Sequence, residues 1–165
     1  MPHHAYPIFK PVFRLFINSN LEIVSQFENG NRIHSIITGG HSESSDNHYP
    51  FNVKINSGVN WLYLNKQSQI LTLDASIRAE THEGHGVYIR FKGQAKFTDS
   101  LKAVLDETAN TMEYWDTEFF IKPVIETDGS TRVNWVNDKL FVGRGRYVRD
   151  EAGQLVLEFF VSMCH

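Results

Sequence analysis

Short runs of residues in which apolar and polar side chains alternate follow one another along most of this chain. In residues 71–80 every second side chain is apolar, and the same alternation returns in residues 87–92. A period of two is typical of a β-strand that buries one face and exposes the other. The runs that predict strands are residues 13–17, 21–27, 33–38, 51–56, 59–64, 70–79, 86–92, 118–126, 140–148 and 155–163. Many short strands with turns every ~8–12 residues predict an all-β, antiparallel sandwich or barrel.

One predicted hairpin can be aligned in two registers around residues 82–84. A two-residue turn would place Ile77 opposite Arg90 and mix apolar with charged side chains on both faces. A three-residue loop that ends in a glycine keeps one face apolar and the other polar. We predict this second register, which places Asp74 opposite Lys92 and makes Asp74 and Arg90 diagonal neighbours.

A single segment predicts a helix rather than a strand. Asp99 or Ser100 could cap its start. The apolar stripe with helical spacing consists of Leu101, Val104, Leu105, Thr108 and Met112. We expect this short helix to cover one end or side of the sheet. The chain as a whole, residues 1–165, is predicted to be one β-barrel domain, because 165 residues fit the size of a single domain.

Composition and charge exclude several functional classes. The net charge is −3 and the basic residues are dispersed, so we expect no nucleic-acid partner. No apolar run approaches the ~20 residues of a membrane span. The one cysteine, Cys164, predicts no internal disulfide. The chain begins without a basic region followed by an apolar one, and we expect a cytoplasmic protein.

Motifs for metal, phosphate and nucleophilic chemistry are weak. His82 and His85 have ligand-like spacing, but they flank a hairpin tip and have no third ligand at a fixed offset. Gly143 and Gly145 lie inside a strand run, where close backbone approach or a bulge explains them better than phosphate binding. No local signature of a catalytic serine or cysteine occurs. We therefore expect no metal site and no cofactor.

One polar cluster has two interpretations. Its members share one face of the predicted hairpin: Asp74, Tyr88, Arg90 and Lys92. The alternation places this face outside the barrel, where cross-strand ion pairs contribute little. Alternatively, a carboxyl, a phenol and a guanidinium converge in a pocket for a polar aromatic ligand. The walls of such a pocket would come from Trp61, Phe119 or Phe120, and Trp135.

Several short motifs, in order, resemble the domain-of-unknown-function family 3237, a group of calycin-like β-barrels. The motifs are Arg32 with Ile36-Ile37-Thr38-Gly39-Gly40, Gly58-Val59-Asn60-Trp61, Leu73-Asp74-Ala75, Glu83-Gly84 with Val87-Tyr88-Ile89-Arg90 and Gly93, Phe119 before Pro123, and Trp135-Val136-Asn137 with Leu140-Phe141-Val142-Gly143-x-Gly145. The similarity extends over residues 11–161. It implies a calycin- or lipocalin-like barrel.

The chain also departs from the family pattern at three motifs. Asn60 replaces an aspartate, and Ser76 replaces an arginine. Residues 118–121, Glu-Phe-Phe-Ile, replace Tyr-Phe-Arg-Thr. These changes imply a pocket that is less cationic and more aromatic than that of a typical relative. They favour a bulky, largely apolar substrate.

The resemblance further implies an activity. Some fungal relatives resemble polyketide-tailoring enzymes that cyclise prenylated phenols by adding the hydroxyl across an alkene. By this resemblance, the chain would be a cofactor-independent cyclase or isomerase that works in the barrel pocket. Asp74 is the first candidate for the acid and Glu118 the second, because burial can keep a carboxyl protonated. Arg90 would stabilise the phenolate, and Tyr88 or His34 would relay the proton. The substrate would also contact Asn60, Trp61, Phe120 and Trp135. The rings of Trp61, Phe120 and Trp135 could stabilise cationic carbon.

Two other functions stay open from the sequence. A non-catalytic, lipocalin-like barrel would bind a hydrophobic aromatic molecule and release it unchanged. A structural or partner-binding domain would have no enclosed cavity. We also expect a homodimer, since sheets with exposed edges or apolar patches often associate.

Overall fold

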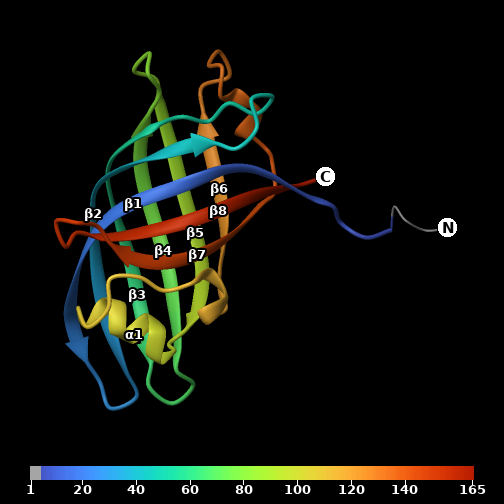
Figure 1. Ribbon diagram of the computed structural model, residues 1–165. Helices are drawn as coiled ribbons and strands as arrows, with labels where there is room; N and C mark the ends of the chain where they lie inside the picture. Colours follow the sequence, from blue (N-terminus) through green and yellow to red (C-terminus); the bar gives the residue numbers. More distant parts are fainter. Residues whose placement is uncertain (1–4) are drawn as a thin grey trace.

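The computed structural model describes residues 5–165 and shows a closed antiparallel β-barrel (Figure 1). Eight strands follow one another around the barrel in chain order, and β8 closes it against β1. The strands are β1 (Phe9–Gln26), β2 (Gly30–Ser44), β3 (Lys54–Asn65), β4 (Ile70–Glu80), β5 (Gly86–Lys96), β6 (Phe119–Thr127), β7 (Phe141–Arg149) and β8 (Leu155–Cys164). One α-helix, α1 (Asp99–Leu105), and two 3₁₀ turns, η1 (Tyr114–Asp116) and η2 (Asn134–Val136), lie between them. The predicted fold class is confirmed.

Ten predicted strand runs form eight strands because two pairs of runs are continuous. Residues 13–17 and 21–27 belong to β1, whose pairing with β2 shifts register between Asn18 and Ser19 but does not stop. Residues 51–56 and 59–64 similarly contribute to β3, with a shift between Ile55 and Ser57. Bulges of this kind bend a strand without ending it. The polar residues at each bulge resemble a turn in the sequence, so each of these strands is predicted as two runs.

The predicted register of the β4–β5 hairpin is confirmed. Ala79 lies opposite Val87, and Asp74 lies opposite Lys92. The loop glycine, Gly84, has a φ of +85°, which is the left-handed conformation that this loop requires. One face of the hairpin is therefore buried and the other is exposed.

Helix α1 covers one end of the barrel, near the β1–β2 and β3–β4 turns (Figure 1). Its N-cap is Thr98, whose hydroxyl accepts a hydrogen bond from the Leu101 backbone N–H, rather than the expected Asp99 or Ser100. The helix ends at Leu105, so the exposed Thr108 lies outside it. Leu101 and Val104 are its buried side chains and pack into the core.

The barrel interior is filled by inward-facing side chains, many of them aromatic. The ring of Phe159 lies 5.4 Å from that of Phe91 and 5.5 Å from that of Phe119, measured between centroids. Gly145 faces the same ring, and a Cβ there would overlap it. This close approach explains the glycine at that position, as the sequence predicted. An eight-stranded barrel has about the width that side chains alone can fill.

Tyr147 is a polar residue within this core. Its side chain is fully buried, and its hydroxyl has no hydrogen-bond partner in residues 5–165. Burial raises the pKa of the hydroxyl well above its ordinary value of 10.0. A buried hydroxyl without a partner costs free energy that a phenylalanine ring would not.

We therefore expect Tyr147→Phe to raise the free energy of unfolding by about 1 kcal/mol at neutral pH. The wild-type protein should lose stability as the pH rises above 10, because the hydroxyl ionises more readily in the unfolded chain than in the core. The variant should lose less over the same range. Urea unfolding between pH 7 and 11 measures both effects. A variant less stable than wild type at pH 7 would show that the hydroxyl has a partner.

The joint between β6 and β7 is the shortest in the barrel. These strands pair at only two positions, Phe120 with Arg144 and Ile121 with Gly143, whereas β7 and β8 pair at nine. Beyond Ile121, β6 has no ladder partner on its β7 side in the described part of the chain. Two hydrogen bonds between Asn137 and the backbone of Thr127, 3.0 Å each, hold its far end.

Candidate functional site

A groove of about 570 Å³ lies on the outer face of β4, β5 and β6. It is lined by Asp74 and Ser76 of β4, Tyr88, Arg90 and Lys92 of β5, and Lys122 and Val124 of β6. These side chains point outward because their inward neighbours, such as Phe91 and Ile121, are buried in the core. The volume is in the range of small-molecule sites.

Strand registry aligns the charged groups of the groove in one row across the sheet. Trp61 of β3 lies opposite Asp74, Asp74 lies opposite Lys92, and Lys92 lies opposite Lys122. Directly opposed residues have Cβ atoms about 4.5–5.5 Å apart, so each side chain can reach its neighbours. Arg90 lies two residues before Lys92 on the same face of β5 and is diagonal to Asp74.

The Asp74 carboxylate is unpaired within the part of the chain that the structure describes. No ion pair within 4.0 Å in residues 5–165 includes Asp74, Arg90, Lys92 or Lys122. The Asp74 backbone N–H donates to the Asn60 Oδ1, 3.2 Å away, and Asn60 itself is buried behind the sheet. Asn60 thus fixes the strand under Asp74 and lies outside the groove.

Trp61 and His34 continue this surface across β3 and β2. Their rings are 4.5 Å apart between centroids, and Trp61 is 41% exposed. The exposed Ile36 lies on the same outer face, opposite Val59. An aromatic shelf therefore lies beside the Asp74 carboxylate.

The structure corrects the expected location of the pocket. Asp74, Tyr88 and Arg90 come together, but on the outside of the barrel, as the alternation alone indicated. Glu118 is 67% exposed and forms an ion pair with Lys96 at 3.4 Å, so it is not a buried acid. Side chains on the outward face of these strands cannot reach the barrel interior, which the core side chains fill.

Two other predicted contacts lie elsewhere. Trp135 is half-buried at the β6–β7 connection, where its Nε1 donates to the Pro50 carbonyl over 2.7 Å and its ring packs near Phe13. It is a packing residue apart from the groove. Phe120 is 42% exposed near the start of β6, two residues before Lys122, and borders the groove without lining it.

Lys122 and Val124 are lining residues that we did not predict. The outward positions of β6 alternate as Phe120, Lys122, Val124 and Glu126, a signal visible in the sequence. The β5–β6 register that places them beside β5 was not visible, because a helix and a long connection separate the two strands. With Lys122 included, the groove holds three cationic side chains and one carboxylate. It is more cationic than expected.

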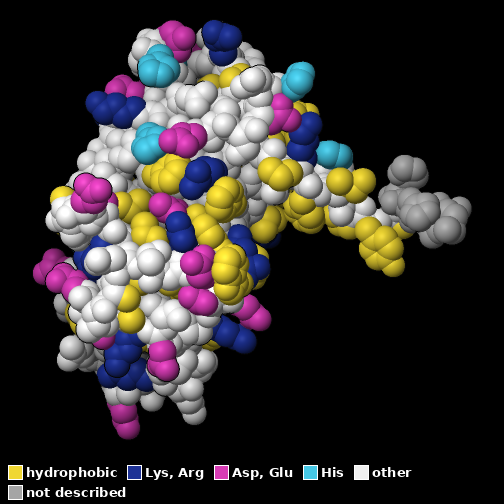
Figure 2. Space-filling model, viewed as in Figure 1, with side chains coloured by type: hydrophobic (Ala, Val, Ile, Leu, Met, Phe, Trp, Pro, Cys, Tyr) yellow, Lys and Arg dark blue, Asp and Glu magenta, His cyan; other side chains and the backbone are white. Residues whose placement is uncertain are grey.

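A second outer face, formed by β1, β8 and β7, also gathers aromatic and cationic side chains. Figure 2 shows hydrophobic side chains grouped around Lys and Arg across the middle of this view. Arg14 lies 4.7 Å from the ring centroids of both Phe16 and Phe160. A depression on this face, lined in part by Phe120 and Phe160, has a volume of about 240 Å³.

The cations of this second face are already engaged. Arg146 Nε donates to Glu158 over 2.9 Å, and Arg144 Nε donates to the Tyr114 carbonyl over 3.1 Å. Burial raises the pKa of the Tyr114 hydroxyl, and the neighbouring Glu158 raises it further. The groove on β4–β6, where the charges lack partners, is therefore the better candidate site.

Within residues 5–165, no group of three or more His, Cys, Asp or Glu side chains is placed to hold a metal ion. His82 and His85 both lie within the β4–β5 connection. In the same part of the chain, no helix is long and apolar enough to span a bilayer.

Comparison with known families gives one match. Residues 7–162 match the family described as "Protein of unknown function (DUF3237)". No curated protein matches the chain.

Solved structures share the fold at low identity. A conserved protein of unknown function from Rhodopseudomonas palustris is 18% identical, with a TM-score of 0.77 over 97% of this chain and 99% of that one. A β-barrel-like protein from Acinetobacter baumannii is 17% identical, with a TM-score of 0.68 over 100% of both chains. An enzyme from Penicillium herquei is 13% identical, with a TM-score of 0.59 over 94% of each chain.

Proposed function

We propose that this chain, which belongs to the DUF3237 family, is a cofactor-independent cyclase that acts in the outer groove of β4–β6. Its substrate is an aromatic small molecule with a phenolic hydroxyl and an alkene side chain. The reaction adds the hydroxyl across the alkene and forms an oxygen-containing ring. The fold shared with an enzyme from Penicillium herquei is compatible with a catalytic role.

The observation that carries this proposal is an unpaired carboxylate in a cationic groove beside an aromatic shelf. Asp74 has no ion-pair partner in residues 5–165 and lies next to Trp61. Tyr88 and Arg90 line the same groove. A carboxylate can accept a phenolic proton, and a guanidinium can stabilise the anion that forms.

The proton and electron balance closes without a cofactor. The phenolic O–H proton moves to Asp74, and the phenolate oxygen forms a C–O bond to one alkene carbon. The π-electron pair moves to the other alkene carbon and into a conjugated carbonyl, where Arg90 faces the enolate. Asp74 returns the proton to that carbon, directly or through Tyr88. The sum is an isomerisation.

The location of Asp74 favours an activated alkene. Protonation of an isolated prenyl alkene requires a strong acid, which a desolvated carboxyl could supply. Asp74 is exposed on the barrel surface, so this condition is not met. A carboxylate base with cationic neighbours fits an alkene conjugated to a carbonyl better. The prenylated phenol implied by the sequence resemblance is therefore the second choice of substrate.

Ring closure of 2′-hydroxychalcone and of a 2-prenylphenol tests the proposal. We expect the protein to accelerate closure of the chalcone above the buffer rate, with little effect on the prenylphenol. Because isomerisation leaves the mass unchanged, chromatography and proton NMR of the alkene signals measure it. Tight binding with both compounds recovered unchanged would instead identify a non-catalytic binding protein.

A further inference from the structure

Two lysines face each other on the outer surface of the groove. Lys92 of β5 and Lys122 of β6 are directly opposed, and both are exposed. Their Cβ atoms are about 4.5–5.5 Å apart, and like charges in this arrangement destabilise a sheet. Arg90 lies two residues from Lys92 on the same face. The sheet thus concentrates positive charge at this position.

Neither lysine has an acidic partner within 4.0 Å in the described residues. Asp74 is the only acid lining the groove among residues 5–165, and it does not pair with either lysine within 4.0 Å. Glu126 lies four residues beyond Lys122 on β6, about 13 Å along the strand. At the end of β5, by contrast, Lys96 has a partner, Glu118, which directly precedes β6 and lies 3.4 Å away. The lysine pair is therefore a local excess of charge on a chain whose net charge is −3.

We propose that Lys92 and Lys122 together bind a carboxylate group of the aromatic substrate. This inference rests on the proposed function and narrows its substrate class to hydroxyaryl carboxylates. Two ammonium groups at this spacing can each donate to one oxygen of a single carboxylate. The ring would then extend along the row toward Asp74 and Trp61. A helix N-terminus is the feature that typically binds phosphate, and none of the residues that line the groove belongs to a helix. The groove therefore favours a carboxylate.

A pair of isosteric probes tests this site without turnover. Calorimetric titration at fixed ionic strength compares 4-hydroxybenzoate with the neutral 4-hydroxybenzamide. We expect the wild-type protein to bind the acid at least tenfold more tightly. The double variant Lys92→Gln/Lys122→Gln should lose this preference, whereas the control Lys96→Gln should keep it. The double variant should also unfold about 1–3 °C higher than wild type in low salt, because the repulsion is removed.

Two results would overturn the inference. One is equal or absent binding of the two probes by the wild-type protein, and the other is a preference that survives in the double variant. The outcome is separable from that of the proposed function. A preference for the acid without any ring closure would disprove the cyclase and leave the carboxylate site standing. Equal ring closure of neutral and carboxylated chalcones would disprove the carboxylate site and leave the cyclase standing.

Discussion

Replacing Asp74 by asparagine is expected to slow ring closure by about 10²–10⁴-fold, the usual contribution of a positioned acid–base group. The amide cannot accept the phenolic proton, while its size and position stay the same. Binding should weaken little, so the loss should appear in kcat rather than in KM. Steady-state kinetics with 2′-hydroxychalcone measures both constants.

Glu22→Gln is the matched control for this variant. Glu22 is an exposed carboxylate on β1, opposite His34, in the same cross-strand row as Asp74 but three strands away. It should leave kcat unchanged. Both variants should keep the wild-type unfolding temperature, because neither side chain has an ion-pair partner in residues 5–165. Full activity in Asp74→Asn would remove Asp74 from the mechanism.

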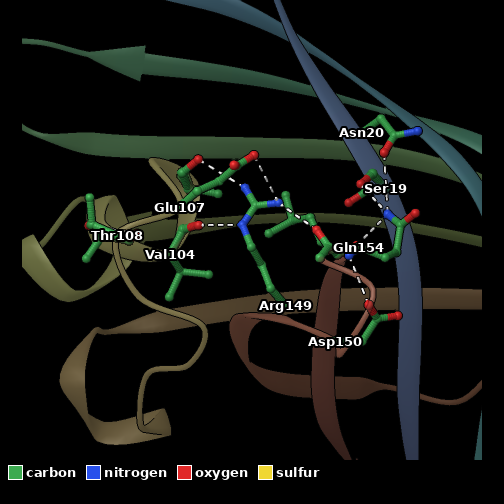
Figure 3. Close-up of polar contacts among 12 residues, drawn as sticks. Ser19, Asn20, Val104, Glu107, Thr108, Arg149, Asp150 and Gln154 are labelled. Atoms are coloured by element: carbon green, nitrogen blue, oxygen red, sulfur yellow. Dashed lines mark hydrogen bonds and ion pairs between the residues drawn. The ribbon is translucent and has the colours of Figure 1, made fainter.

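Replacing Arg149 by alanine is expected to destabilise the fold by about 3 kcal/mol, since hydrogen bonds from a charged donor contribute 1.5–3 kcal/mol each and water can replace them in part. The guanidinium donates to the carbonyls of Val104, Leu105 and Gly153 over 2.9–3.1 Å. Figure 3 shows the side chain extended between the end of α1 and the β7–β8 turn, with Glu107 nearby. Only 12% of the Arg149 side chain is exposed.

Thermal and urea unfolding measure this effect. A loss of about 3 kcal/mol lowers the unfolding temperature by about 6–12 °C in a chain of this size. Arg149→Lys should fall between wild type and alanine, because an ammonium keeps the charge but cannot span three carbonyls. Arg78→Ala, on the exposed face of β4, is the control and should change the temperature little. If Arg149→Ala matches that control, α1 is held by its apolar contacts alone.

The sequence was most informative where one local pattern determined the structure. Alternation in residues 71–80 and 87–92 was sufficient to predict both the β4–β5 register and the outward direction of Asp74 and Arg90. The resemblance to enzymes implies a pocket in the barrel interior, against that alternation. The periodicity was the better guide, because a side chain cannot change faces without a shift of register.

Other features depend on contacts between distant segments. Lys122 joins the groove through a β5–β6 pairing that spans α1 and η1, and no local pattern encodes it. The role of Trp135 depends on a carbonyl 85 residues away, at Pro50. The continuity of β1 through Asn18 and Ser19 depends on the partner strand, which keeps pairing where the side chains resemble a turn. The homodimer stays a prediction.

The short joint between β6 and β7 has a consequence for how this chain avoids aggregation. In an open sheet, the free edges usually belong to the outermost strands and can recruit other chains. Here β1 and β8 are paired, and Ile8, just before β1, exchanges two backbone hydrogen bonds with His165, just after β8. Among the described residues, the edge without a ladder partner lies instead on an internal strand, along β6 after Ile121. The first residues of that edge are Lys122 and Pro123, a charge and a missing N–H, both of which discourage a further strand from pairing. The lysine assigned to ligand binding would thus also keep the barrel from joining its neighbours.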